Sequence, residues 1–205
     1  MADGTTLQLP HLASHPVHIS LFADVANAPF LRQQLLEGNS AFEYAFLDAS
    51  TIISVNHVLA AVFRAVNDLL HGRLKSRNVH SEIVFSLSPN NNIAESFRRF
   101  GISDTTRTLL AIKVLNSPAT DPIPDPSSHL ATHVQGQRVP FNDATLALTA
   151  EIPRVRKIYK LDSGGDAGGR KGKGGKGQPN GAMAANSTIK EMEAVILGIM
   201  AVKGS

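Results

Sequence analysis

Apolar and polar side chains alternate with a period of two in some segments of the chain, and this pattern predicts strands. Residues 17–21 alternate between aliphatic and polar positions, and residues 83–87 place Ile, Phe and Leu on one face. Residues 109–115 are nearly all apolar, as in a strand that is buried on both faces. We therefore predict three strands at these positions.

Other segments carry apolar residues three and four positions apart, which is the spacing of an amphipathic helix. Residues 29–37 begin with a proline and end before Gly38, so a short helix is predicted there. A longer helix is predicted at residues 50–71, with Ser50 as its N-cap. Residues 93–100 predict another short helix that ends at a glycine.

The C-terminal part of the chain predicts two further helices. Asn142 is the predicted N-cap of one helix, and Pro153 should stop it. Residues 155–161 fit either a helix or a strand. The last helix is predicted at residues 187–202, with a capping box in its first turn.

These elements predict a mixed α/β fold in one domain, with a β-sheet flanked by helices. The domain comprises residues 1–162 and 182–205. Residues 163–181 are rich in Gly and Lys and cannot bury enough apolar surface to offset their ordering entropy, so we expect a disordered insertion before the C-terminal helix. Residues 117–128 contain four prolines and predict an extended loop.

The charge balance separates this insertion from the rest of the chain. The formal net charge is +3, from 20 basic and 17 acidic residues. Residues 163–181 hold four basic residues and one acidic residue, so the other residues carry 16 of each sign. The folded body therefore lacks a general electrostatic footprint for nucleic acid.

Several classes of protein are disfavoured by what the sequence does not contain. There is no cysteine, which excludes disulfides, thiolate metal sites and cysteine nucleophiles. The longest apolar run, residues 195–202, is far shorter than the roughly 20 residues that cross a bilayer, and no signal peptide is visible, so we expect no membrane partner. His11, His15 and His18 cluster without a carboxylate at metal-site spacing. We therefore expect no catalytic residue, no metal and no cofactor, and an enzyme is the least favoured function.

One segment is unusual, because three asparagines follow one another before a helix. Asn92 and Glu95 have capping-box spacing, with Asn in place of Ser or Thr. The asparagines could simply cap the helix and fix a turn. Alternatively, they form an exposed, amide-rich helix N-terminus that binds a phosphate, a nucleotide edge or a partner's backbone.

Three segments together resemble one protein family. They are the run SLSPNNNIAESFRRFGIS at residues 86–103, HSEI at residues 80–83 and VRKIYKL at residues 155–161. With these motifs the chain resembles the kinase-binding, PRPK-binding-protein-like small subunits of the EKC/KEOPS complex, of the fungal type. The resemblance extends from residues 18–22 to residues 196–200, and the Pro-rich and Gly/Lys-rich segments are its departures.

The resemblance implies a non-catalytic regulatory subunit with a mixed α/β fold. Members of this family bind and allosterically stimulate the atypical, PRPK-type kinase/ATPase of the complex, which forms threonylcarbamoyladenosine next to the tRNA anticodon. The subunit also helps to engage the acceptor end of tRNA, and the complex is linked to telomere maintenance and transcription. We therefore expect the kinase, through it the other subunits, and tRNA as partners. The expected location is the nucleus, at chromosomes and telomeres, with the cytoplasm as a second location.

Two groups of residues are predicted as contact sites. The predicted tRNA contacts are Asn91, Asn92, Arg98 and Arg99, whose amides and guanidinium groups can bind phosphate or base edges. The predicted kinase contacts are Val195, Leu197, Ile199 and Val202, because the second half of the last helix is apolar around most of its circumference. Burial of this helix in its own core is the alternative. The alternative function is a stand-alone RNA-binding module that uses the Asn-rich turn and the basic loop.

Overall fold

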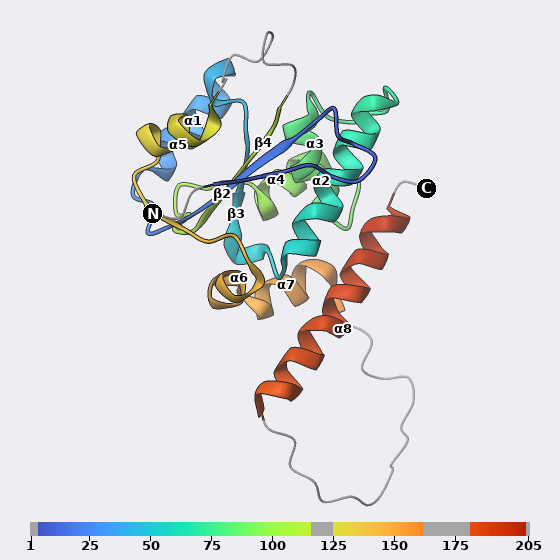
Figure 1. Cartoon of the computed structure of the whole chain (residues 1–205). Helices are drawn as coiled ribbons and strands as arrows, with labels where there is room; N and C mark the ends of the chain where they lie inside the picture. Colours follow the sequence, from blue (N-terminus) through green and yellow to red (C-terminus); the bar gives the residue numbers. More distant parts are fainter. Residues whose placement is uncertain (1–3, 116–124, 162–180, 204–205) are drawn as a thin grey trace, which may run out of the picture.

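A computed structural model describes residues 4–115, 125–161 and 181–203 of the chain (Figure 1). Its centre is an antiparallel sheet in the order β1-β2-β4-β3, and β5 also pairs with β2. The short strands β1 and β5 pair with opposite ends of β2. The strands are β1 (Thr5–Leu7), β2 (Val17–Ala23), β3 (Ala45–Asp48), β4 (Leu109–Val114) and β5 (Gln137–Val139).

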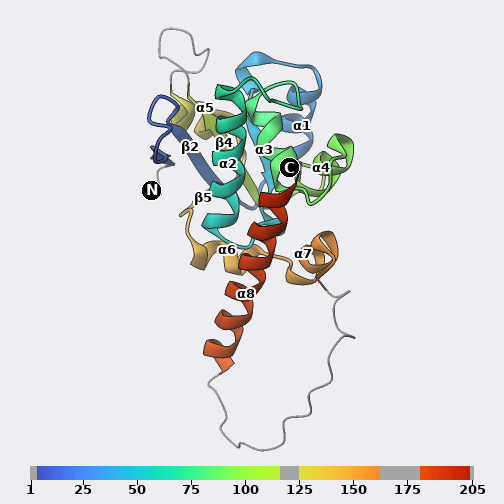
Figure 2. The same cartoon turned by 90° about the vertical axis from the view of Figure 1, so that its right-hand side faces the viewer.

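Helices cover both faces of the sheet, so the domain has two hydrophobic cores (Figures 1 and 2). Helices α1 and α5 pack on one face, and the other helices lie toward the opposite face. The α-helices are α1 (Ala28–Leu36), α2 (Val55–Leu70), α3 (Val79–Leu87), α4 (Ile93–Phe100), α5 (Pro126–His133), α6 (Asp143–Thr149), α7 (Ile152–Tyr159) and α8 (Gly181–Val202). Two 3₁₀ turns, η1 (Ser40–Phe42) and η2 (Ala49–Thr51), flank β3. The predicted mixed α/β single domain is therefore confirmed.

The register of the central strands explains why both cores form. Ile19 of β2 lies opposite Ile112 of β4, and both side chains enter the larger core under α2 and α3. Phe22 and Leu109 are also partners, and they enter the smaller core under α1 and α5. The strands predicted at residues 17–21 and 109–115 are thus confirmed, and both are buried on both faces.

The predicted strand at residues 83–87 is wrong, because these residues form the second half of α3. The Asn78 side chain caps this helix by accepting a hydrogen bond of 2.8 Å from the Ser81 amide. Nearly every residue of α3 is buried, including the polar His80, Glu82 and Ser86, so no exposed polar face marks a helical period in the sequence. The apolar residues at alternate positions therefore gave a false strand signal.

The boundaries of α2, α6 and α7 differ from the prediction. The helix predicted from Ser50 begins as η2, and α2 starts after Ser54, whose hydroxyl accepts a hydrogen bond of 3.1 Å from the His57 amide. Asn142 caps α6 as predicted, but α6 has already ended when Pro153 occupies the first turn of α7. Because proline fits the first turn of a helix, it begins an element here. Residues 155–161 are therefore mainly helical.

The two predicted loops lie largely outside the described residues. At the end of residues 117–128, the Asp125 carboxylate caps α5 and Pro126 occupies its first turn, so the last part of this predicted loop is helical. Of residues 163–181 only Gly181 is described, and it is the first residue of α8. Helix α8 thus begins before residue 187, and the predicted capping box lies inside it. None of the described helices has the length and apolar character to span a membrane.

Candidate functional site

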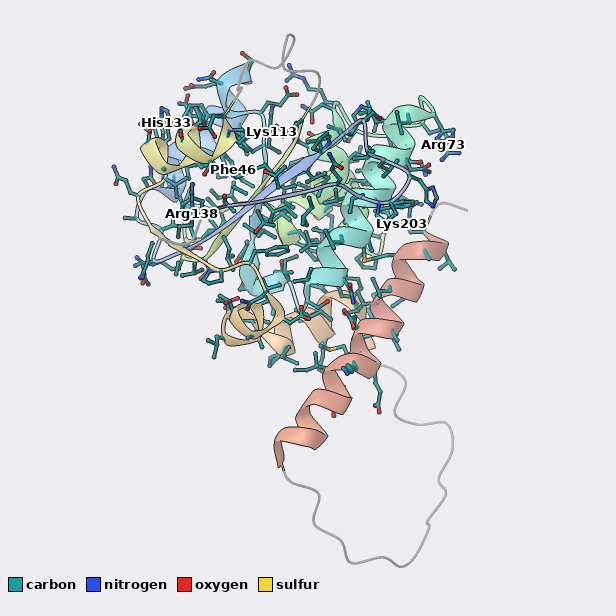
Figure 3. The ribbon with its side chains drawn as sticks, in the orientation of Figure 1. Phe46, Arg73, Lys113, His133, Arg138 and Lys203 are labelled. Carbon is teal, nitrogen blue, oxygen red and sulfur yellow. The ribbon has the colours of Figure 1, made fainter. Side chains whose placement is uncertain are left out.

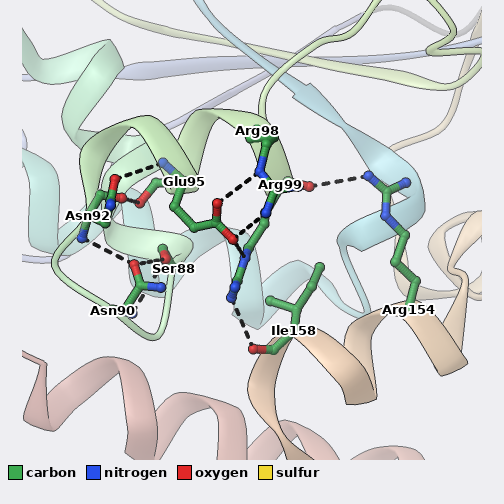
Figure 4. A network of polar contacts seen from close by, with 9 residues as sticks. Ser88, Asn90, Asn92, Glu95, Arg98, Arg99, Arg154 and Ile158 are labelled. Atoms are coloured by element: carbon green, nitrogen blue, oxygen red, sulfur yellow. Dashed lines mark hydrogen bonds and ion pairs between the residues drawn. The ribbon is translucent and has the colours of Figure 1, made fainter.

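The side chains of two of the three consecutive asparagines make hydrogen bonds within their own turn (Figure 4). The Asn92 side chain accepts a hydrogen bond of 3.0 Å from the Glu95 amide and so caps α4. The Asn90 side-chain oxygen accepts from the Ser88 hydroxyl (3.2 Å) and from the Asn92 amide (3.1 Å). Asn91 is exposed, and its side chain makes no hydrogen bond among the described residues. The capping role is therefore confirmed for Asn92, and Asn91 presents the open amide.

The two neighbouring arginines of α4 share one carboxylate but face different surroundings. Arg98 donates to Glu95 through Nε (2.8 Å) and Nη2 (2.6 Å), and Arg99 donates to it through Nε (2.6 Å). The hydrogen bonds from Arg98 and then Arg99 lower the pKa of Glu95 to about 2. The Arg98 side chain is 73% exposed, whereas that of Arg99 is 25% exposed. Only Arg98 is thus widely accessible to a ligand.

Arg99 is used to attach α4 to α7. Its Nη1 group donates to the carbonyl oxygen of Ile158 at 3.3 Å. In the opposite direction, Arg154 of α7 donates to the carbonyl oxygen of Arg99 at 3.3 Å (Figure 4). Arg154 also donates to the Asp48 carboxylate at 2.9 Å. Arg154 was not among the residues predicted from the sequence, although it lies directly before the VRKIYKL motif.

A pocket of about 730 Å³ lies beside α4, between α1, η1 and α3. This volume is in the usual range of small-ligand sites. Apolar side chains of Leu35, Leu36, Tyr44 and Phe97 line it, together with the basic side chains of Arg32, Arg77 and Arg98. The pocket therefore combines aromatic surface with guanidinium groups, which suits a nucleotide with its phosphate.

The charges around the pocket are partly compensated. Arg32 pairs with Asp104 at 3.2 Å, and Arg98 pairs with Glu95. Arg77 is exposed and makes no ion pair within the part of the chain that the structure describes. The left-handed backbone of Gly38 (φ 69°) ends α1 next to the Arg77 guanidinium, and a side chain there would be strained.

His80 lies at the buried side of the pocket and is neutral. Its Nε2 atom accepts a hydrogen bond of 3.0 Å from the Val114 amide, so the ring proton resides on Nδ1. Burial, and then the positive charge of Lys113, lower the His80 pKa to about 3. The positive charge of the pocket therefore comes from arginines at its rim.

Helix α8 has one face in the core and one open flank. Met192, Ile196 and Met200 are buried against the larger core. Val195 and Val202 lie two turns apart on one flank and are 52% and 71% exposed. Leu197 and Ile199 are half-buried. The four predicted kinase contacts thus divide into two open positions and two that are half-covered by the domain itself.

Of the three N-terminal histidines, His18 has a structural role in the sheet. Both ring nitrogens of His18 are hydrogen-bonded, one to Thr6 (3.2 Å) and one to Ser20 (2.9 Å). Within residues 4–115, 125–161 and 181–203, no group of three or more His, Asp or Glu side chains could hold a metal ion. None of the residues predicted as contact sites takes part in these hydrogen bonds of His18.

Comparison with known proteins gives a consistent set of relatives. The family model described as kinase binding protein CGI-121 matches residues 22–204. EKC/KEOPS complex subunit cgi121 of Aspergillus fumigatus is 59% identical over 157 residues, which cover 76% of this chain and 82% of that protein. The protein of the same name in Aspergillus terreus is 50% identical over 200 residues (98% and 96%), and that of Schizosaccharomyces pombe is 32% identical over 154 residues (75% and 87%).

Proposed function

Because this chain belongs to the kinase binding protein CGI-121 family, we propose that it is the non-catalytic regulatory subunit of an EKC/KEOPS complex. In this role it binds and allosterically stimulates the complex's atypical, PRPK-type kinase/ATPase. Its partners are that kinase, through it the other subunits, and tRNA.

The proposed kinase contact rests on one observation, the exposed apolar flank of α8. A helix end that is buried on one side and exposes Val195 and Val202 on the other leaves apolar surface for a partner. Lys203 and Arg64 hold the last turn of this helix in place, so the surface is already organised in the free protein.

The pocket beside α4 supports the tRNA contact. We propose that Arg98, Arg77 and Arg32 bind phosphate groups of the tRNA acceptor end and that the exposed Phe97 ring contacts its bases. Asn91 supplies an open amide at the start of α4. Asn92 and Arg99, the other two predicted tRNA contacts, also hold α4 in position.

We further propose that the chain acts in threonylcarbamoyladenosine formation next to the tRNA anticodon. We also propose the linked roles in telomere maintenance and transcription, and with them a location in the nucleus, at chromosomes and telomeres, with the cytoplasm as a second location. The family and the relatives' names support the complex, and these finer roles are part of the proposal.

Co-purification of the full chain with the kinase tests the α8 contact. The double variant Val195→Lys and Val202→Lys should lose the kinase while the free protein keeps its circular dichroism spectrum, since cations near a helix C-terminus are tolerated. Leu148→Lys is the matched control, because this apolar side chain is 88% exposed on α6. Leu197 and Ile199 are poorer test positions, since charges there would also disturb the domain. Retained kinase binding in the double variant would place the contact elsewhere.

The alternative function is a stand-alone RNA-binding module. It predicts that the isolated chain binds tRNA through residues 163–181 and that this binding weakens steeply with salt. Replacing the four basic residues of this segment by serine separates the two functions. Tight binding by the isolated protein that disappears in this variant would favour the module over the regulatory subunit.

A further inference from the structure

The residue that follows α8 caps the C-terminal end of α3. Lys203, directly after α8, is 6% exposed, and its ammonium group donates a hydrogen bond to the carbonyl oxygen of Phe85 in the last turn of α3. The same ammonium lies 3.4 Å from the centroid of the Phe85 ring (Figure 3 shows Lys203 beyond the end of α8). The ammonium gives this carbonyl oxygen in the last turn of α3 a second hydrogen bond, and a cation is favourable at the C-terminal end of a helix.

The carbonyl groups at the end of α8 are satisfied by α2. Arg64 donates to the carbonyl oxygen of Met200 at 2.5 Å and also to that of Lys203. Asp68, one turn further along α2, lies 3.9 Å from the Arg64 guanidinium. The last turn of α8 is therefore fixed to α2 through its main chain and to α3 through its side chain.

Phe85 also begins an unbroken series of hydrogen bonds that ends at the exposed face of α4. The Ser88 amide donates to the same Phe85 carbonyl at 3.1 Å, and the Ser88 hydroxyl donates to Asn90. Asn90 accepts from the Asn92 amide, and Asn92 caps α4 at Glu95. The Glu95 carboxylate then holds Arg98, as described above. A displacement of the Phe85 carbonyl would thus be felt at the N-terminus of α4.

Burial of Lys203 has an energetic cost that the local contacts offset. Burial, and then the charge of Arg64, lower the pKa of Lys203 to about 7, while the carboxylate of Glu82 acts in the opposite direction. The Phe85 carbonyl and ring compensate the ammonium. An aliphatic side chain could fill the same space without this cost.

We propose that Lys203 is a positioning residue that couples the open flank of α8 to the Asn-rich turn and to Arg98. A partner on α8 and an RNA end beside α4 then influence each other's binding through the Phe85 carbonyl. This inference rests on the proposed function, which puts the kinase on α8 and the tRNA end beside α4. Chains of packed and hydrogen-bonded residues can carry coupling between two sites, and the contacts from Lys203 through Phe85 and the Asn-rich turn to Arg98 form such a chain.

The absence of cysteine in this chain allows a direct chemical test. In the variant Lys203→Cys, the single thiol is alkylated in denaturant with 2-bromoethylamine, which restores a lysine-like ammonium group. Alkylation with 2-bromoethanol gives a neutral side chain of the same length. Both forms are refolded and compared by circular dichroism, and Lys190→Cys on the exposed face of α8 receives the same treatments as the control. The variant Lys203→Met, which needs no refolding, is the second neutral form.

Two measurements read out the positioning role. The first is the set of amide NMR shifts of residues 90–95 in the isolated chain, which needs no partner. The second is the ratio of tRNA affinities of the chain with and without the kinase. The ammonium form should reproduce the wild-type shifts and ratio, whereas both neutral forms should shift these amides and reduce the ratio by about fivefold or more. The control forms should agree with the wild type.

The outcomes separate this inference from the proposed function. If folded neutral and ammonium forms give the same amide shifts and the same affinity ratio, Lys203 does not couple the two surfaces. If the Val195 and Val202 variants keep the kinase, the proposed kinase surface is wrong. In that case the amide shifts alone still decide whether Lys203 positions the Asn-rich turn.

Discussion

Arg154 donates a hydrogen bond of 3.3 Å to the main-chain carbonyl oxygen of Arg99, and this contact joins the end of α4 to α7. Together with the hydrogen bond from Arg99 to Ile158, it fixes one of two adjacent arginines and leaves Arg98 accessible. Arg98 and Arg99 are adjacent and chemically identical in the sequence, and only their surroundings in the fold give them different roles.

Reversing the charge of Arg98 should weaken tRNA binding with little effect on folding. An exposed ion pair such as that of Arg98 with Glu95 contributes little to stability, because solvent screens it. In the assembled complex, Arg98→Glu should lower tRNA affinity about tenfold or more, which corresponds to ~1.4 kcal/mol. Filter binding at fixed salt measures this effect. Arg73→Glu, which makes the same charge change at the end of α2, should leave the affinity unchanged. Equal affinities for wild type and Arg98→Glu would exclude this contact.

Removing Arg154 should destabilise the fold. Its guanidinium lies 2.9 Å from the carboxylate of Asp48, which is only 11% exposed and would be left without this partner. We expect Arg154→Met to lower the free energy of unfolding in urea by about 2 kcal/mol. The double variant with Asp48→Asn should recover part of this loss, because the unpaired carboxylate is gone. Full additivity of the two substitutions would show that the pair is not coupled.

Substitutions of Asn91 and Asn92 should have different effects, on tRNA binding and on the free energy of unfolding respectively. Asn92→Ala removes the α4 cap and should lower the free energy of unfolding by about 1 kcal/mol, and Asn92→Asp should restore it, since Asp caps equally well. Asn91→Ala should leave thermal unfolding unchanged and should weaken tRNA binding in the complex. The opposite assignment of the two effects would contradict the geometry of this turn.

Acid should destabilise the protein through two buried histidines. Burial lowers the pKa of His57 to about 3, and burial followed by the charge of Lys113 does the same for His80. An unfolded histidine titrates near about 6.5, so between these values the unfolded state binds more protons than the folded state. The stability that each neutral histidine contributes is therefore complete above the pKa of the unfolded state. It falls as the pH drops toward the folded pKa, by about 1.4 kcal/mol per pH unit for each histidine.

Urea unfolding at a series of pH values from 7 to 4 measures this slope. His80→Gln should reduce the slope by the share of one histidine, because glutamine does not titrate. His71→Gln is the control, since His71 lies exposed at the end of α2. An unchanged slope in His80→Gln would show that His80 is already protonated or exposed in the folded state.

Features that depend only on residues close together in the sequence were predictable from it. The caps at Asn92 and Asn142 act on amides three residues further along, so local spacing is sufficient to identify them. Strands β2 and β4 carry enough apolar residues to stand out by themselves. The short strands β1, β3 and β5 were missed, because their formation depends on partners far away in the sequence.

Only the tertiary structure decided the nature of α3 and the division of roles in the candidate site. A helix enclosed on nearly all sides buries its polar residues together with its apolar ones, so its period cannot be recognised from the sequence until its neighbours are known. The pocket combines residues from α1, η1, α3 and α4, and the Lys203 contact joins residues 118 positions apart. The sequence by itself determined the mixed α/β class, the family motifs and the local caps. The three-dimensional packing determined which arginine is open and which lysine is buried, because burial and long-range hydrogen bonds depend on contacts between distant segments.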